Sequence, residues 1–461
     1  MKRLVALLIA VGALAPGFAQ KATAADEEQA ATITIEGQTY SIVPDEEVRQ
    51  LGFNVPDVKP ENNAANDYLK AIDAYHSIER GDPLDRLRDE VMRTGWTEDA
   101  APLAAYIERN EKALAHLQAA ASKDVCHFPV LIPLGSSLDE TGPAGVVLAH
   151  LAKLREFARF LVTVGKAREF EGRYGDALDT YLLILRLGDH ASQDPFLISG
   201  LVGIACNAIG LRAIEQCLVR NEIDEETLAR VQKRLAELAG GRPSVLVSMR
   251  GERAFSTSIV EYLIKHTKLR GGFADVSEDG GQGKVWQAAM AAMLKSEEGR
   301  AQVRADVAAF WDAMGKALEM PLPEYIRSSA GDEPISKAKA RKVPPNIMAL
   351  LGPALSHSRM QFARHDLSWT VLDVELALSR YAAEHGQYPE SLDELKDLML
   401  SDGIDPYSGK PLHYRLEDDG AYTIWSVGEN LEDDGGEVGP KSPDWQAKDF
   451  VWNSAVIHGE E

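Results

Sequence analysis

The feature that most constrains the fold is a series of amphipathic helical patterns that starts near residue 60. In "NAANDYLKAIDAYHSIE" apolar residues recur at spacings of four, three and three: Tyr68, Ile72, Tyr75 and Ile78. This spacing puts them on one face of a helix, where they form a stripe that packs against a neighbour. Glycine and proline separate the successive patterns, as in stacked antiparallel hairpins. The sequence predicts a mostly α-helical domain of such hairpins over residues 60–327.

One hairpin, "LVTVGKAREFEGRYGDALDTYLLILRLGD", has small residues where two helices would approach closely and an aromatic residue that fills the gap. These residues, Gly165, Ala177 and Tyr181, resemble the corresponding positions of a tetratricopeptide repeat. Other positions depart from that repeat: Arg168, Ile184 and Asp189. We predict a divergent, tetratricopeptide-like helical body, with a plain α-helical bundle as the alternative.

The N-terminal residues have the pattern of an export signal. Lys2 and Arg3 precede the apolar run "LVALLIAVGALAPGFA", which ends in small residues. This arrangement is typical of a secretory signal peptide. The alternative is a membrane anchor, but the run is shorter than the ~20 apolar residues of a spanning helix, and Pro16 interrupts it. We predict a signal peptide over residues 1–25, no transmembrane segment after its cleavage, and a mature protein that is periplasmic or extracellular.

The net charge of the chain limits the kind of partner that it can bind. Lys and Arg number 49 against 71 Asp and Glu, a net charge of −22. Such a chain repels phosphate backbones, so we expect no nucleic-acid partner.

The chain has three cysteines: Cys126, Cys206 and Cys217. The last two lie in one helical pattern, roughly 16 Å apart, too far for a disulfide within a straight helix. Cys126 pairs with one of them, or all three are buried thiols. No pair has the spacing of metal ligands.

Two regions flank the helical domain. After the signal, "ATITIEGQTYSIVP" alternates β-branched and polar residues, which predicts a short β-hairpin segment within residues 26–59. At the other end, "SSAGDEPISKAKARKVPPN" has no periodicity, which predicts a linker over residues 328–346.

The remaining residues, 347–461, are predicted to form a small α+β domain. A long helix comes first, with an apolar stripe at Leu367, Val371, Val374, Leu378 and Tyr381. We expect it to end near Gly386, because glycine favours that position. Asp419-Gly420, between "LHYRLE" and "YTIWSV", predicts a hairpin.

The order of helix, "YPESLDEL", "DPYSGKPLHYR", "YTIWSVGEN", "DDGGE" and "DFVW" resembles the soluble domain of the major pseudopilin of type II secretion. The resemblance covers residues 357–455. With its helical body, the whole chain resembles a group of secreted bacterial helical-repeat proteins. A pseudopilin begins with an apolar filament helix, whereas here "SHSRMQFARHD" and a whole domain come first. We therefore expect a borrowed fold that is used for contacts.

The resemblance also implies a calcium loop, because major pseudopilins bind calcium after the serine-containing strand. Calcium takes six to eight oxygen ligands on a flexible loop. The matching positions are Val427 through its carbonyl, Asn430, Asp433, Asp434, Asp444 and Asp449. The sequence departs from the family at Asn430, where aspartate is usual, and at Pro440 and Pro443. The alternative is a solvated acidic turn.

We identify no catalytic motif. The eleven histidines form no HExxH pair, and Ser136 and Ser137 lack the Gly-x-Ser-x-Gly context. We assign no catalytic residue and no cofactor besides calcium. The sequence favours a non-catalytic binding or scaffold protein of the bacterial envelope. Its helical body would bind a protein or peptide partner, and its C-terminal domain would serve as a docking module. The alternative is an extracytoplasmic hydrolase that uses an acidic groove in the helical domain.

Overall fold

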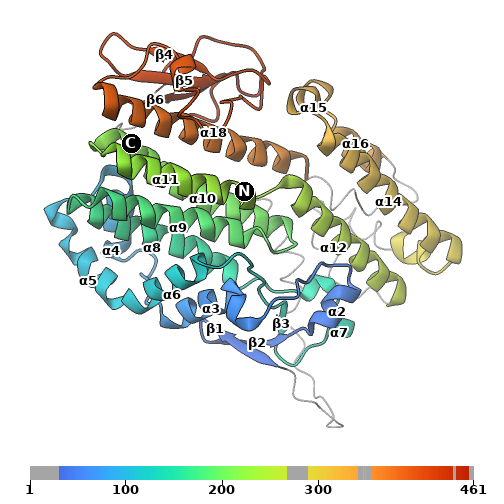
Figure 1. Ribbon diagram of the computed structural model, residues 1–461. Coiled ribbons are helices and arrows are strands. Elements are labelled where there is room, and N and C mark those ends of the chain that lie inside the picture. The colour runs from blue at the N-terminus through green and yellow to red at the C-terminus, as the bar shows by residue number, and fades with distance from the viewer. Residues whose placement is uncertain are drawn as a thin grey trace.

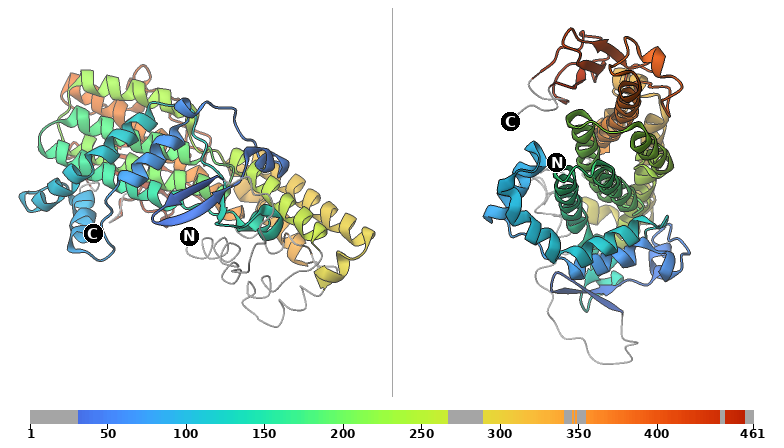
Figure 2. Two further views of the ribbon diagram at one scale, coloured as in Figure 1. Left: turned by 90° about the horizontal axis from the view of Figure 1, so that it is seen from below. Right: turned by 60° about the vertical axis from the view of Figure 1, so that its left-hand side comes forward.

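The computed structural model describes residues 31–266, 289–340, 346, 348, 355–439 and 443–455. The predicted signal peptide and part of the predicted linker lie outside these ranges. The described chain is mostly helical, as predicted, and it carries two three-stranded sheets (Figure 1). Figure 2 shows the sheets at opposite ends of the helical body.

The N-terminal sheet confirms the predicted hairpin. Strands β1 (Thr32–Ile35) and β2 (Gln38–Ile42) pair antiparallel. The turn between them has positive φ at Glu36 (51°) and Gly37 (77°). A third strand, β3 (Leu131–Pro133), pairs with β2 from within the helical region and was not predicted. The hairpin is thus fastened to the helical body.

The body is a stack of helices with α8, α9 and α10 at its centre (Figure 1). The described α-helices before α18 are α2 (Asp45–Gln50), α3 (Ala64–Ala74), α4 (Pro83–Thr94), α5 (Ala101–Arg109), α6 (Glu111–Ala121), α7 (Leu138–Thr141), α8 (His150–Phe170), α9 (Tyr174–Ala191), α10 (Leu197–Arg220), α11 (Glu225–Leu238), α12 (Val245–Lys265), α14 (Glu297–Glu319), α15 (Leu322–Ser328) and α16 (Asp332–Ala340).

Helix α16 lies within the predicted linker. The sequence predicts a linker without periodicity over residues 328–346, and within it Asp332–Ala340 is helical. Ile335 and Ala338 are buried in the core, and α16 packs against α14. Tertiary packing therefore stabilises a helix that local periodicity did not reveal.

The close approach of α8 and α9 depends on Gly165. A Cβ atom at this position would lie 2.1 Å from Cε1 of Tyr181, whose ring is fully buried. Ala177 is buried as well. The predicted small–aromatic contact is confirmed, while the repeat itself stays a prediction.

Helix α10 is the one described helix that is long and apolar enough to cross a membrane by length and composition alone. In the structure it lies in the core against α8, α9 and α18. It also buries the polar side chains of Asn207, Glu215 and Gln216. The prediction of no membrane span after the signal stays a prediction.

The sequence left two alternatives for the cysteines, one disulfide or three buried thiols. In the structure Cys126, Cys206 and Cys217 are buried free thiols.

The C-terminal region consists of helix α18 (Leu355–His385) and a sheet of order β4-β5-β6. Gly386 follows the helix with φ 78°, as predicted. The strands are antiparallel: β4 (His413–Leu416), β5 (Tyr422–Ser426) and β6 (Phe450–Asn453). The predicted hairpin therefore forms, and the first acidic phrase, 416–420, is its turn.

Helix α18 is buried on two faces. The predicted stripe belongs to a cluster that includes Ile424 and Trp452 of the sheet. A second stripe, Trp369, Leu372 and Leu376, belongs to the core of the helical body. The helix lies between the sheet and the body (Figure 1), so region 347–461 shares its core with the helices before it.

Two carboxyl groups are buried at this junction. Glu215 of α10 and Glu375 of α18 are 3% and 0% exposed. Tyr422 donates a hydrogen bond to Oε1 of Glu375 (3.2 Å), and Arg212 lies 4.0 Å from Glu215. Burial raises the pKa of both carboxyls, and the charge of Glu215 raises the pKa of Glu375 further. A proton on this pair avoids two adjacent buried charges.

We expect Gly165→Ala to lower the free energy of unfolding by about 1–3 kcal/mol, because the added methyl group overlaps the Tyr181 ring. The matched control is Gly315→Ala in α14, where a Cβ meets nothing within 4 Å. That change is expected to stabilise by about 0.5–1 kcal/mol. Urea unfolding measures both, and equal effects would contradict the contact.

The buried carboxyl pair predicts a pH dependence of stability. A carboxyl with a raised folded pKa stabilises the fold fully below its unfolded value, near 4.5, and this stability is lost as pH rises through the folded pKa. We therefore expect Glu375→Gln to become progressively more stable than the wild type as pH rises. Urea unfolding between about pH 5 and pH 9 measures this. The exposed Glu384→Gln on the same helix is the control, and parallel curves for Glu375→Gln and wild type would exclude the assignment.

Candidate functional site

A groove of about 600 Å³ lies where α5 and the start of α6 meet the end of α8. We call it the acidic groove. Its apolar lining is formed by Trp96, Ala101, Ala104, Ile107, Ala167 and Phe170. Glu98, Glu108, Glu111 and Glu171 complete it. Most lining residues are exposed, so the groove is open to solvent along its length.

The α5 wall follows from the pattern of that helix. Leu103 and Tyr106 are buried, and Tyr106 packs edge-on against Phe160 of α8 with 5.6 Å between ring centroids. Ala101 and Ala104 consequently lie on the outer side. Asn110 then interrupts the helix, because its side chain accepts a hydrogen bond from the backbone N–H of His76 (2.7 Å) and donates to the Tyr106 carbonyl (2.9 Å).

The opposite wall is the end of α8. Gly172 has φ 74°, and its N–H donates to the carbonyl of Glu169 at 2.9 Å. This left-handed glycine ends the helix. The turn leaves Phe170 at the edge of the groove with 56% of its surface exposed, an unusual position for a large aromatic side chain.

The charges of the groove are largely uncompensated. Glu171 pairs with Arg173 (Oε2–Nη1 2.9 Å). Glu98, Glu108 and Glu111 are exposed, and among the described residues none of the three has a side-chain hydrogen bond or ion pair. The lining contains no hydroxyl, thiol, amine or imidazole group. Carboxylates are hydrogen-bond acceptors when ionised, so the groove suits a ligand that donates.

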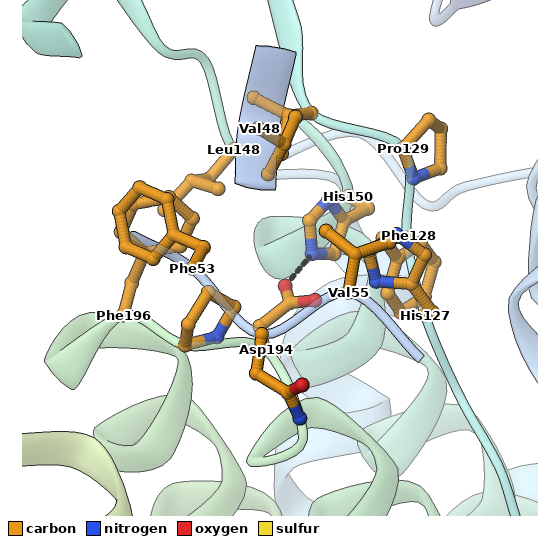
Figure 3. Close-up of a pocket in the computed structure, with 13 residues that line it drawn as sticks. Val48, Phe53, Val55, His127, Phe128, Pro129, Leu148, His150, Asp194 and Phe196 are labelled. Carbon is orange, nitrogen blue, oxygen red and sulfur yellow. Dashed lines mark hydrogen bonds and ion pairs between the residues drawn. The ribbon is translucent and has the colours of Figure 1, made fainter. Parts of the chain in front are cut away.

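A second cavity is too small for a substrate. It measures about 10 Å³ and is lined by His127, Phe128, His150 and Asp194, among others (Figure 3). Such a volume holds about a single water molecule. His150 Nε2 lies 2.8 Å from Asp194 Oδ2, and its ring stacks on Phe128 at 3.9 Å. The Asp accepts from both His150 and Ser199 (3.4 Å), so a histidine does not link an acid to a nucleophile as a catalytic triad requires.

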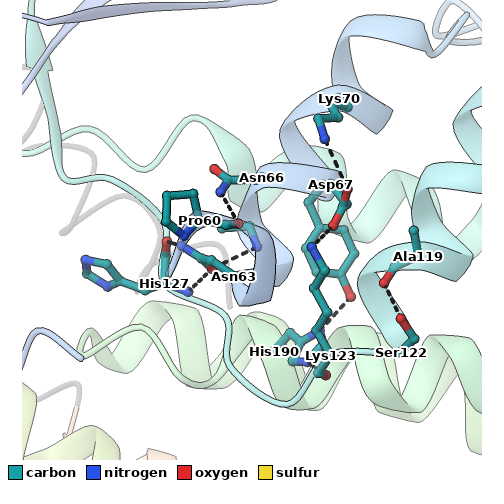
Figure 4. Close-up of polar contacts among 12 residues, drawn as sticks. Pro60, Asn63, Asn66, Asp67, Lys70, Ala119, Ser122, Lys123, His127 and His190 are labelled. Carbon is teal, nitrogen blue, oxygen red and sulfur yellow. Dashed lines mark hydrogen bonds and ion pairs between the residues drawn. The ribbon is translucent and has the colours of Figure 1, made fainter. Parts of the chain in front are cut away.

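The polar contacts around α3 are structural (Figure 4). Asn63 caps the helix by accepting from Ala65 N–H (3.1 Å), and it also bonds to the backbone N–H and carbonyl of His127 (2.9 and 2.8 Å). His190 Nδ1 lies 2.9 Å from the Tyr68 hydroxyl. Burial lowers the pKa of His190 to about 3, so it stays neutral inside the core.

The structure brings together part of the predicted calcium loop. The Asp449 carboxylate accepts hydrogen bonds from the backbone N–H groups of Asp434 (3.0 Å) and Gly436 (2.9 Å). The Asn430 amide donates to Asp434 (2.7 Å), and Asp433 is adjacent in the chain. Val427 and Asp444, in contrast, make no hydrogen bond with these four in the described part of the loop.

These residues do not fit a calcium ion as arranged. Lys448 Nζ lies 2.9 Å from Asp434, and this ion pair lowers the pKa of that carboxyl. The indole N–H of Trp425 donates to Asp433 (3.0 Å) and lowers its pKa. Among the described residues, no group of three or more His, Cys, Asp or Glu is placed to hold a metal. Protein donors thus engage the carboxylates of Asp433, Asp434 and Asp449, which calcium would need, and the calcium site stays a prediction.

The chain matches no protein-family model, no curated protein and no solved structure. The resemblances to a pseudopilin, to a tetratricopeptide repeat and to secreted helical-repeat proteins therefore stay predictions from the sequence.

The sequence analysis did not identify the acidic groove. One signal was present in "APLAAYIERNE", where Ala101, Ala104, Glu108 and Glu111 share a side at helical spacing. The second wall could not be inferred, because Phe170 lies about sixty positions away and looks like a core residue of its helix.

Titration of the protein with calcium tests the loop. From the occupied carboxylates we expect no heat of binding at millimolar calcium. A saturable heat that disappears in Asp433→Ala would contradict this arrangement and support the calcium prediction. Asp419→Ala, in the first acidic phrase, is the control.

Proposed function

We propose that this chain is a secreted, non-catalytic binding or scaffold protein of the bacterial envelope. The helical body binds a protein or peptide partner in the acidic groove. The C-terminal α18 and sheet form a docking module that resembles a pseudopilin.

The acidic groove is the observation that carries the proposal. It is large enough for several side chains of a partner, with about 600 Å³, and it places Trp96 and Phe170 beside small residues. Phe170 is exposed and Trp96 is partly buried, and aromatic side chains next to such depressions are common anchors in protein interfaces. A contiguous exposed apolar patch with a polar rim marks many interaction sites, and Phe170 lies in such a patch with Trp96 and Ile107.

The arrangement of α18 and the C-terminal sheet supports the proposed docking role. A long helix followed by a three-stranded antiparallel sheet is the order that the pseudopilin resemblance implies. Because α18 is packed into the body, the tail is held in a fixed position relative to the groove. A partner in the groove and a contact through the sheet would thus be joined by one rigid scaffold.

The second candidate is an extracytoplasmic hydrolase that uses the same acidic groove. Its support is the four carboxylates in the lining, since glycoside hydrolysis needs a pair of carboxylates. The open lining, without another nucleophile or base, favours binding over this chemistry.

Cross-linked affinity capture of the full mature protein from its own cells tests the proposal. We expect a partner to be captured by the wild type and lost in Phe170→Ser. The matched control is Leu134→Ser, because Leu134 is 57% exposed elsewhere on the surface. Equal capture by all three proteins would exclude the groove as the binding site. Hydrolysis of an envelope polymer that is lost in Glu108→Gln would favour the hydrolase.

A further inference from the structure

We infer that the partner of the acidic groove is a cationic amphipathic α-helix, a helical segment with Lys or Arg on the flanks of an apolar stripe. This inference rests on the proposed binding function and specifies the chemistry of the partner.

The donors and acceptors of the lining favour a helix over an extended peptide. The only side-chain donor in the lining is the indole N–H of Trp96, and its other polar groups are carboxylates. An extended peptide would find few side-chain donors in this lining for its backbone carbonyl groups. An α-helix satisfies its own backbone hydrogen bonds, so only its side chains have to match the groove.

The dimensions suit the same occupant. Helix α5 spans residues 101–109, and at ~1.5 Å per residue it is about 12 Å long. That length matches about two turns of a partner helix. The alanine side chains of the floor, at positions 101, 104 and 167, leave room for larger apolar side chains. Ile107 and Phe170 would flank the apolar stripe of the partner.

The carboxylates of the groove determine which side chains the partner should carry beside its apolar stripe. Glu98, Glu108 and Glu111 have no ionic partner among the described residues and lie along the α5 side of the apolar floor. An acidic helix would meet three like charges, and a neutral helix would leave them without a counterion. Lys or Arg side chains reach such carboxylates while their methylene stems cover the apolar surface.

Fluorescence anisotropy of labelled probe peptides with the full mature protein tests the inference. The first probe is a capped helical peptide of Leu, Ala and Lys. The second carries Glu in place of Lys, and the third has the composition of the first with central prolines that prevent a helix. We expect binding of the first probe only, weakened about tenfold by Glu98→Gln, Glu108→Gln and Glu111→Gln together, since each exposed pair contributes modestly.

A matched triple variant separates the effect of the three groove carboxylates from the effect of the overall net charge. Glu237→Gln, Glu319→Gln and Glu324→Gln remove the same charge from exposed positions on other helices, and we expect little change in affinity. Equal weakening by both triple variants would show attraction by the net charge and overturn the inference. Binding of the Glu or proline probe that is lost in Phe170→Ser would overturn the cationic helix and leave the binding function standing. If no probe binds while Phe170→Ser abolishes capture from cells, the cationic helix is likewise overturned and the binding function stands.

Discussion

Helix α18 packs Trp369, Leu372 and Leu376 into the helical body and presents Val371 and Val374 to the cluster beneath the C-terminal sheet. Burial of these side chains contributes about 1.5–3 kcal/mol for each large apolar residue, so neither contact is easily given up. The helix also carries Asp373, which accepts hydrogen bonds from the backbone N–H groups of Leu400 and Ser401. The same helix therefore completes the body and fixes the tail, and the C-terminal region is a layer of the whole fold.

Helix α5, which forms one wall of the acidic groove, lies on the side of the body away from the C-terminal sheet (Figure 1). The ends of its two walls are set by separate features: Asn110 donates a hydrogen bond to the Tyr106 carbonyl at the end of α5, and the left-handed Gly172 ends α8. A preformed groove loses little conformational entropy when it binds. The protein thus combines a rigid scaffold with an apolar, negatively charged surface whose lining suits a donating partner.

Much of the secondary structure was predictable because it depends on local periodicity, as in the stripe of α18 and the hairpin turn at Gly420. The second buried face of α18 was missed because Asp373 and Glu375 interrupt it, and their burial depends on Leu400, Ser401 and Tyr422. Strand β3 was missed because its pairing is with a strand about ninety residues away. The groove depends in the same way on distant segments, so composition and spacing did not reveal it.

The most direct test is a photo-cross-linking amino acid placed at Ala104, on the floor of the acidic groove, in the mature protein in its own cells. The same amino acid at the exposed Ala308 of α14 is the control. Mass spectrometry of the adducts then identifies the cross-linked segment. We predict an adduct at Ala104 alone, on a basic amphipathic helical segment of another protein. Adducts that are the same at both positions, or none at Ala104, would contradict the account.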